Sequence, residues 1–213
     1  MMKGEQDANE NLEMRFIGCN CDDGVHGDGN DFHGTDMPDG TEFDAEYYAS
    51  HNPDVVAAFG DDPEALLNHY LMYGKAEGRN GAKTLEEQTR EMEQEMLQLI
   101  NANRSEAGTG GLSLDGRLCR AAQIRAKEMA DNQYLAHSRP DGSDIFSVYG
   151  EVGFEFHGYY HYGENIAFGH RLVEEVMTGW MHSPGHRANI LQQEYHLVGV
   201  GRYEKYWVQL FAS

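Results

Sequence analysis

The sequence has few cysteines, and their odd number excludes a disulfide framework that pairs every thiol within the chain. Of 213 residues only Cys19, Cys21 and Cys119 are cysteines, and three thiols cannot all pair internally. Small secreted domains with little core depend on such bridges. We therefore expect packing of apolar side chains to hold this fold. Cys119 is expected to be a buried small apolar residue, whereas the state of Cys19 and Cys21 stays open.

Basic residues are also scarce. The chain carries 16 Lys and Arg against 36 Asp and Glu, a formal net charge of −20. The excess is uneven, since residues 1–83 hold 18 acidic and 5 basic side chains while residues 84–213 hold 18 and 11. Nucleic-acid binders need Lys and Arg to displace counterions from phosphates. We therefore do not expect nucleic acid as a partner.

Long apolar runs are absent too. No stretch of about 18 apolar residues occurs, so no transmembrane helix is expected. Phe16-Ile17-Gly18-Cys19 is similar to a lipoprotein cleavage box, but no apolar run precedes it and Glu10, Glu13 and Arg15 interrupt the approach. We expect no lipid anchor here, and we expect any export signal to have been removed before this sequence begins.

Residues 1–40 are poor in apolar side chains and rich in Gly, Asp and Asn. Such a composition cannot offset the entropy of ordering, so a flexible acidic leader is predicted. Its Gly27-Asp28-Gly29-Asn30-Asp31 run resembles one turn of a calcium-binding nonapeptide repeat, but a single copy cannot stack into a roll. A solvated acidic loop is the favoured interpretation. It is also favoured over a zinc site made of Cys19, Cys21, His26 and His33.

From residue 41 the composition changes, because apolar residues recur at helical spacing between Pro and Gly. Asn52-Pro53-Asp54 and Asp61-Asp62-Pro63-Glu64 are typical helix starts, and Gly74 and Gly78 are typical helix ends. Two or three short helices are predicted, forming a small helical module over residues 41–83.

Within residues 41–81 a set of motifs resembles a short module of bacterial surface and secreted proteins. The motifs are Tyr47-Tyr48, Asn52-Pro53-Asp54-Val55, Gly60, His69-Tyr70, Gly74 and Glu77-Gly78-Arg79. The resemblance implies no particular chemistry. His51 and His69 are expected to be packing or surface residues rather than ligands.

A longer domain is predicted from residue 84. Thr84-Leu85-Glu86-Glu87 has capping-box spacing, which predicts a helix running to about Ala107. A second helix is predicted after Asp115 and a third around Trp180, because apolar residues there share one helical face. Residues 197–203 and 206–212 flank Glu204-Lys205 and predict a β-hairpin. These patterns alone indicate only a mixture of helix and strand.

An ordered set of motifs runs through this domain. In chain order they include Leu99-Ile100-Asn101, Leu114-Asp115, Ala121-Ala122, His137-Ser138, Gly163-Glu164-Asn165-Ile166, Ser183-Pro184-Gly185-His186-Arg187 and Val198-Gly199-Val200-Gly201. Together they resemble the bacterial branch of the cysteine-rich secretory protein, antigen five and pathogenesis-related (CAP, or SCP-like) superfamily. The resemblance implies an α+β fold, a three-layer α-β-α sandwich over residues 84–213.

The same resemblance implies a central cleft that holds two His and two Glu in many members. His137, Glu164 and His186 match three of these positions, but the position of the fourth, a Glu three residues after the Trp, is Ser183. A mechanism that needs both carboxylates therefore does not carry over. We expect the cleft to be lined by His137, Glu164, His186, Ser183 and Asn165.

Two imidazoles and one carboxylate are compatible with two kinds of site. They would hold a divalent metal such as zinc and leave positions open for water or ligand. They would equally form a polar network in which Glu164 accepts a hydrogen bond from an imidazole. The chain lacks the His-Glu-x-x-His motif of zinc proteases, and neither Ser138 nor Ser183 lies in a Gly-x-Ser-x-Gly elbow.

The leading hypothesis is an exported, non-enzymatic bacterial CAP protein that binds a small molecule, lipid or divalent metal through His137, Glu164 and His186. One alternative is a metal-dependent hydrolase of peptide or cell-wall material, with Glu164 as base or ligand. A second alternative is a cell-surface interaction protein that docks through residues 41–81 and has a vestigial cleft.

Overall fold

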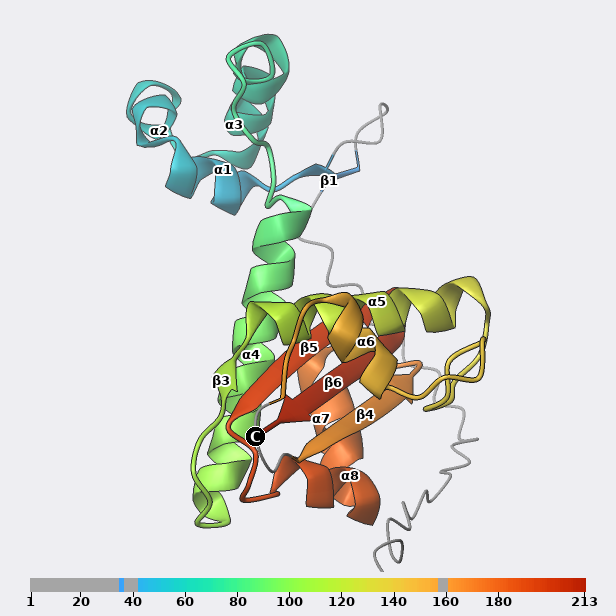
Figure 1. The fold of residues 1–213 in the computed structure, drawn as a ribbon. Coiled ribbons are helices and arrows are strands. Elements are labelled where there is room, and N and C mark those ends of the chain that lie inside the picture. Colours follow the sequence, from blue (N-terminus) through green and yellow to red (C-terminus); the bar gives the residue numbers. More distant parts are fainter. Residues whose placement is uncertain (1–34, 37–41, 157–160) are drawn as a thin grey trace, which may run out of the picture. The chain divides into compact units, whose positions relative to one another are not determined.

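The computed structural model describes residues 35–36, 42–156 and 161–213 (Figure 1). The described residues up to Gln94 form one compact unit, and those from Glu95 onward form a second. The sequence-based boundary between residues 83 and 84 stays a prediction. The leader expected over residues 1–40, with Cys19 and Cys21, lies outside the described residues except for one short strand.

The first unit is a small helical module, as the sequence predicted. Its elements are β1 (Thr35–Asp36), β2 (Glu42–Phe43), α1 (Ala45–His51), α2 (Pro53–Phe59), α3 (Pro63–His69) and the π-helical turn η1 (Tyr70–Gly74). Strands β1 and β2 pair antiparallel. Asp44 and Asp62 begin α1 and α3, because each carboxylate accepts a hydrogen bond from a free backbone N–H of the first turn, 3.0 Å away.

Aromatic side chains fill the centre of this module. Its buried core residues are Phe43, Tyr48, Val55, Leu66 and Tyr70. A Cβ at Gly74 would lie less than 3.0 Å from the hydroxyl oxygen of Tyr48, and a Cβ at Gly81 would lie equally close to the ring of Tyr70. Glycine at these two positions therefore leaves room for the tyrosine rings.

The second unit contains the larger sheet and five helices of the described chain. Its helices are α4 (Leu85–Glu106, from Glu95 onward), α5 (Gly116–Asp131), α6 (Phe146–Glu151), α7 (Val173–His182) and α8 (Pro184–Ile190). Its strands are β3 (Ser113–Leu114), β4 (Tyr162–Phe168), β5 (Leu197–Tyr203) and β6 (Tyr206–Ala212). The predicted helices after Thr84, after Asp115 and around Trp180 are thus present, and β5 and β6 form the predicted hairpin.

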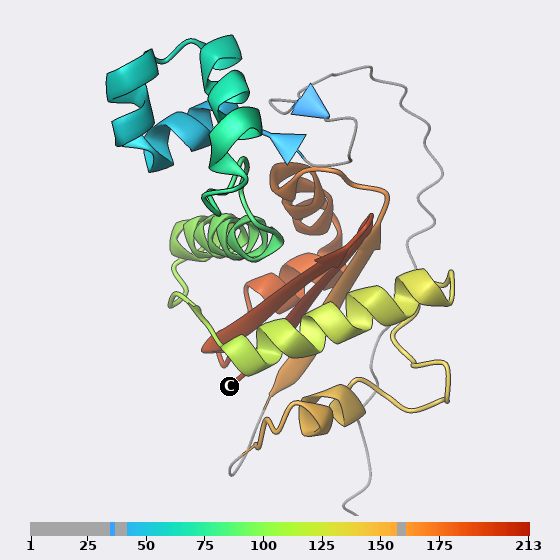
Figure 2. The same cartoon turned by 90° about the horizontal axis from the view of Figure 1, so that it is seen from above.

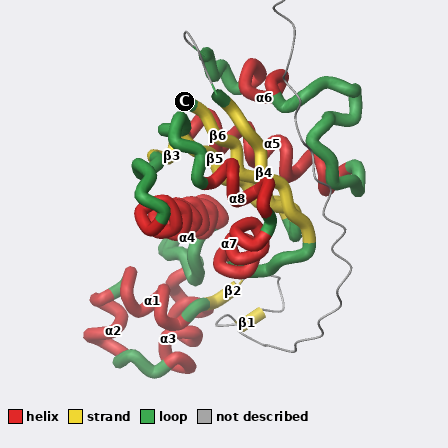
Figure 3. The backbone as a smooth tube through the Cα atoms, turned by 90° about the horizontal axis from the view of Figure 1, so that it is seen from below, coloured by secondary structure: helices red, strands yellow, loops and turns green. Residues whose placement is uncertain are grey.

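This sheet lies between two helical layers. Its strand order is β3-β5-β6-β4, with β6 antiparallel to both neighbours and β3 parallel to β5. Helices α5 and α6 cover one face, and α7, α8 and the C-terminal part of α4 cover the other (Figures 2 and 3). The α+β fold implied by the family resemblance is therefore confirmed.

Strand β6 is buried along its whole length because helices cover both faces of the sheet. Side chains alternate along a strand: Val208 and Leu210 pack with the α5 and α6 side chains, while Gln209 lies near Met96 and Met177 on the opposite side. On α5 the side chain of Cys119 is buried beside the apolar face, as predicted.

The Val-Gly-Val-Gly block lets α5 lie directly against β5. A Cβ at Gly199 would come within 3.0 Å of the backbone carbonyl carbon of Leu118, and one at Gly201 would come equally close to that of Ala122. Backbone atoms cannot rotate away as the end of a flexible side chain can. The two glycines therefore set the distance between helix and strand.

Gly199→Ala is expected to lower the free energy of unfolding by about 1–3 kcal/mol, because the added methyl group forces α5 away from β5. Urea denaturation monitored by circular dichroism would measure the loss. The matched control is Gly150→Ala, at an exposed position of α6 where an added Cβ meets nothing within 4 Å. That variant is expected to be unchanged or stabilised by up to about 1 kcal/mol. Equal stability of both variants would contradict the close helix–strand contact.

Arg104 fixes the chain that follows α8. Its side chain is fully buried at the end of α4 and donates to the carbonyl oxygens of Gly110 (2.6 Å), Ile190 (2.7 Å), Gln192 (2.8 Å) and Tyr195 (3.3 Å). Burial lowers the pKa of this guanidinium. Four carbonyl oxygens accept from four of its five N–H donors, so the end of α8 is held against α4.

Candidate functional site

The sequence-predicted residues come from three separate elements. Glu164 and Asn165 lie on β4, which pairs with β6 so that Glu164 is opposite Leu210. His137 lies in the segment between α5 and α6, and His186 lies in the first turn of α8. No single helix or strand carries the set, so only the tertiary fold assembles it.

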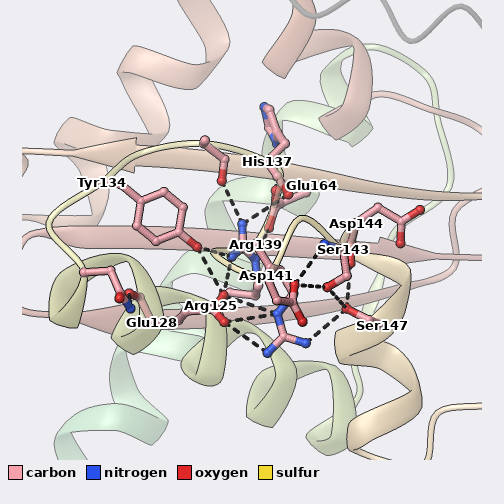
Figure 4. Close-up of polar contacts among 12 residues, drawn as sticks. Arg125, Glu128, Tyr134, His137, Arg139, Asp141, Ser143, Asp144, Ser147 and Glu164 are labelled. Atoms are coloured by element: carbon pink, nitrogen blue, oxygen red, sulfur yellow. Dashed lines mark hydrogen bonds and ion pairs between the residues drawn. The ribbon is translucent and has the colours of Figure 1, made fainter.

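The centre of the site is a buried carboxylate that has two partners (Figure 4). Oε2 of Glu164 accepts a hydrogen bond from Nδ1 of His137 at 2.7 Å, and Oε1 accepts one from Nε of Arg125 at 3.0 Å. The side chains of Glu164 and Arg125 are 1% and 0% exposed, whereas that of His137 is 30% exposed. Solvent therefore reaches this trio at the imidazole of His137.

Arg125 is the residue of this polar network that the sequence-based reasoning missed. Its guanidinium also donates to Glu128 (2.6 Å), to the hydroxyl of Tyr134 (2.9 Å) and to the carbonyl oxygens of Ala136 (2.8 Å) and His137 (3.3 Å). Burial opposes the charge of Arg125, but the attraction of Glu164 and these hydrogen bonds outweigh it and raise the pKa of the guanidinium.

The sequence held a signal for Arg125. It lies seven residues after Leu118, two helical turns along the apolar face of α5, and directly before Ala126. A charged side chain on a face that meets the core needs a buried partner, because burying an unpaired charge is strongly unfavourable. The sequence did not reveal which carboxylate that partner is.

A second arginine holds the same segment at its far end. Nε of Arg139 donates to Glu128 at 3.1 Å, and its guanidinium also pairs with Glu151 and donates to the Ser147 hydroxyl at 3.0 Å. Glu128 thus bridges Arg125 and Arg139. As Figure 4 shows, these contacts lie to one side of His137, and they hold the segment that carries it.

Asn165 connects β4 to α8. Its side chain is fully buried, and its Nδ2 donates to the carbonyl oxygen of His186 (3.2 Å) and to Oε1 of Gln209 (3.0 Å). Nδ2 of Asn189 donates to Oδ1 of Asn165 (2.9 Å) and to the carbonyl oxygen of Glu164 (3.2 Å). Asn165 therefore positions the helix that bears His186.

His186 is partly buried beside the other imidazole. Burial lowers the pKa of His186, and the charge of His137 lowers it further. This favours the neutral imidazole at neutral pH. Ser183 ends α7 and begins α8, and its backbone N–H donates to the carbonyl oxygen of Trp180 at 3.1 Å. That His137, Glu164, His186, Ser183 and Asn165 together line a ligand-binding cleft stays a prediction.

The donor set does not fit a three-ligand metal site. Among the residues that the structure describes, no three His, Cys, Asp or Glu side chains are grouped so that they would hold a metal ion. The reason is visible at Glu164, whose two oxygens already accept hydrogen bonds from Arg125 and His137. The guanidinium supplies the positive charge that a metal would otherwise bring to this carboxylate.

Within the described ranges, every helix is too short or too polar to cross a membrane.

Residues 97–211 match the cysteine-rich secretory protein family, CAP. The uncharacterized protein YkwD of Bacillus subtilis is 36% identical over 121 residues, which are 56% of this chain and 46% of that protein. A solved extracellular protein of Bacillus anthracis with an SCP domain is 29% identical, with a TM-score of 0.55, and the match covers 62% of this chain and 44% of that one. The chain therefore spans less than half the length of these two relatives.

An outer surface protein of Borrelia burgdorferi has the same fold at 20% identity. The TM-score is 0.53, and the match covers 59% of this chain and 94% of that protein. At this identity the likeness concerns the fold alone.

Proposed function

Because the chain belongs to the CAP family of cysteine-rich secretory proteins, we propose that it is exported and binds an organic ligand, a small molecule or a lipid, at His137, Glu164 and His186 without catalysing a reaction. The observation that carries the proposal is the hydrogen bond between His137 and the buried Glu164. An ionised carboxylate only accepts hydrogen bonds, so Nδ1 of His137 carries the proton and the ring has one orientation.

A fixed imidazole suits recognition of a polar group on a ligand. The neutral form of His186 that burial favours adds a weakly polar surface next to it. Pre-organised side chains bind without the cost of ordering them. The site is held in place by hydrogen bonds from Arg125 to Glu164 and from Asn165 to the backbone of His186. Asn189 in turn donates to Asn165.

The hydrolase alternative has less support. A general base must reach the proton that it abstracts, but Glu164 is 1% exposed and both its oxygens are engaged. Among the described residues no three His, Cys, Asp or Glu side chains are grouped to hold the metal that such a hydrolase would need, and the carboxylate of Glu164 is paired with Arg125. Export is supported by the extracellular relative from Bacillus anthracis.

Native mass spectrometry of the purified protein tests the proposal. We expect a co-purified organic molecule that is lost in His137→Ala and His186→Ala, because both imidazoles contact it. The control is His182→Ala, an exposed imidazole on α7 whose Nδ1 lies 2.8 Å from the carbonyl oxygen of Thr178. That variant should retain the molecule. A molecule that all three variants retain equally would place the ligand elsewhere.

Calorimetric titration with zinc at neutral pH separates the organic-ligand site from a metal site. We expect no stoichiometric binding in the micromolar range, because two imidazoles without a carboxylate are a weak zinc site. Stoichiometric zinc binding that disappears in His137→Ala would reverse this conclusion and restore the metal alternative.

A further inference from the structure

The helical module has an open, shallow pocket of about 710 Å³, and the described residues that line it all belong to the module. Ala45 and Ala49 lie one turn apart on α1 and, because they are small, leave the pocket open. Val56 of α2 and the prolines that begin α2 and α3, Pro53 and Pro63, complete its apolar surface. An apolar side chain that enters this pocket would be partly removed from water, which favours binding.

The charged residues that line the pocket are both acidic. Glu46 and Asp61 are exposed, and among the described residues neither has a hydrogen-bond or ion-pair partner for its carboxylate. Other carboxylates of the module are occupied: Asp44 and Asp62 accept from helix N-termini, and Asp54 pairs with Arg79 at 2.8 Å. The pocket therefore offers two carboxylates that no described residue pairs with, beside an apolar surface.

The lining has few groups that would recognise a sugar or another polar small molecule. Ser50 provides its hydroxyl, but that hydroxyl donates to the carbonyl oxygen of Tyr47 at 2.8 Å. Polar ligands need several convergent donors and acceptors. Residues 42–94 carry 12 acidic and 4 basic side chains, so an anionic lipid surface would be repelled.

We propose that this pocket docks a polypeptide segment whose apolar side chains are flanked by Lys or Arg. The apolar side chains would occupy the space between α1 and α2, and the cations would pair with Glu46 and Asp61. Charge complementarity of this kind sets the choice of partner and speeds the encounter. The site is independent of the ligand proposed for His137 and His186.

Fluorescence anisotropy with the full chain tests the docking site. The probe is a labelled synthetic peptide of alternating Leu and Lys, and the comparison probe has Glu in place of every Lys. We expect only the Lys peptide to bind, with an affinity that falls as salt rises from about 50 to about 300 mM, a range over which screening strengthens. Equal binding of both peptides, or no binding of the Lys peptide up to millimolar concentration, would overturn the proposal.

Ser50→Arg places a cation in the pocket, four residues after Glu46 on α1. That spacing favours an ion pair along the helix, so α1 should stay folded while the pocket is filled. We expect the Lys peptide to bind at least about tenfold more weakly. The control Ala57→Arg adds the same charge at an exposed position of α2 outside the lining, and it should change the affinity by less than about twofold. Wild-type affinity in Ser50→Arg would rule out this pocket.

A second pair of variants removes the charges instead. Glu46→Gln combined with Asp61→Asn is expected to weaken binding about two- to tenfold, the range for two exposed ion pairs. Glu42→Gln combined with Glu86→Gln changes the net charge equally at exposed positions outside the lining and should bind like the wild type. Equal affinities of the two double variants would contradict the proposed ion pairs. His137→Ala should bind the peptide normally, which keeps this test separate from that of the proposed function.

Discussion

Arg125→Met is expected to lower the free energy of unfolding by about 3–5 kcal/mol. Arg125 and Glu164 are 0% and 1% exposed, so the substitution leaves a buried carboxylate without its cation. Methionine fills a similar volume, which keeps the loss of packing small. The substitution also removes the hydrogen bonds that Arg125 donates to the segment from Tyr134 to His137. Urea denaturation monitored by circular dichroism would measure the change.

Two further variants show whether the cause is the unpaired charge. Arg120→Met makes the same substitution at an exposed position of α5 and should lie within about 0.5 kcal/mol of the wild type. Arg125→Met combined with Glu164→Gln removes both charges and should recover part of the stability lost in the single variant. A loss below about 1 kcal/mol in Arg125→Met alone would mean that the ion pair does not hold the site together.

Trp180→Ala is expected to cost about 3–5 kcal/mol, since removing a large buried ring loses its transfer free energy and leaves a cavity. Trp180 is 2% exposed, and its indole N–H donates to the carbonyl oxygen of Ile166 on β4 at 3.3 Å. Val176 and Met177 share its buried face on α7. The substitution therefore weakens the packing of α7 against the sheet, and thermal or urea unfolding would detect it.

The control for Trp180→Ala is an exposed apolar residue of the same unit. Leu135 is 49% exposed, so Leu135→Ala should change the free energy of unfolding by less than about 0.5 kcal/mol. Trp180→Phe should fall between the two, because it keeps an aromatic ring and loses the hydrogen bond. A cost for Trp180→Ala no larger than that for Leu135→Ala would place this side chain outside the core.

The ion pair between Arg125 and Glu164 is compatible with a site that has one carboxylate fewer than the two found in many family members. The sequence has Ser183 where the resemblance implied a second Glu. The remaining Glu164 is held by a buried guanidinium and an imidazole, so the site needs neither a second carboxylate nor a metal to satisfy its charge.

Local sequence patterns were enough to predict the main helices, the hairpin and the family. The 3.6-residue period of α5 and α7, the alternation in β5 and β6, and the capping residues are local properties, and each of these elements is present in the structure. The ordered motifs indicated the CAP resemblance, and the match over residues 97–211 confirmed it. The same motifs identified His137 and Glu164, which the structure joins by a hydrogen bond.

The residues around that hydrogen bond are brought together by contacts between elements that are distant in the chain. Arg125 and Glu164 are 39 residues apart, and Asn165 reaches the backbone of His186 across 21 residues. Periodicity shows which face of an element is buried, but not which residue of another element it meets there. The partner of a buried charge is set by how α5, β4 and α8 pack together, because only that packing brings such groups within hydrogen-bond distance.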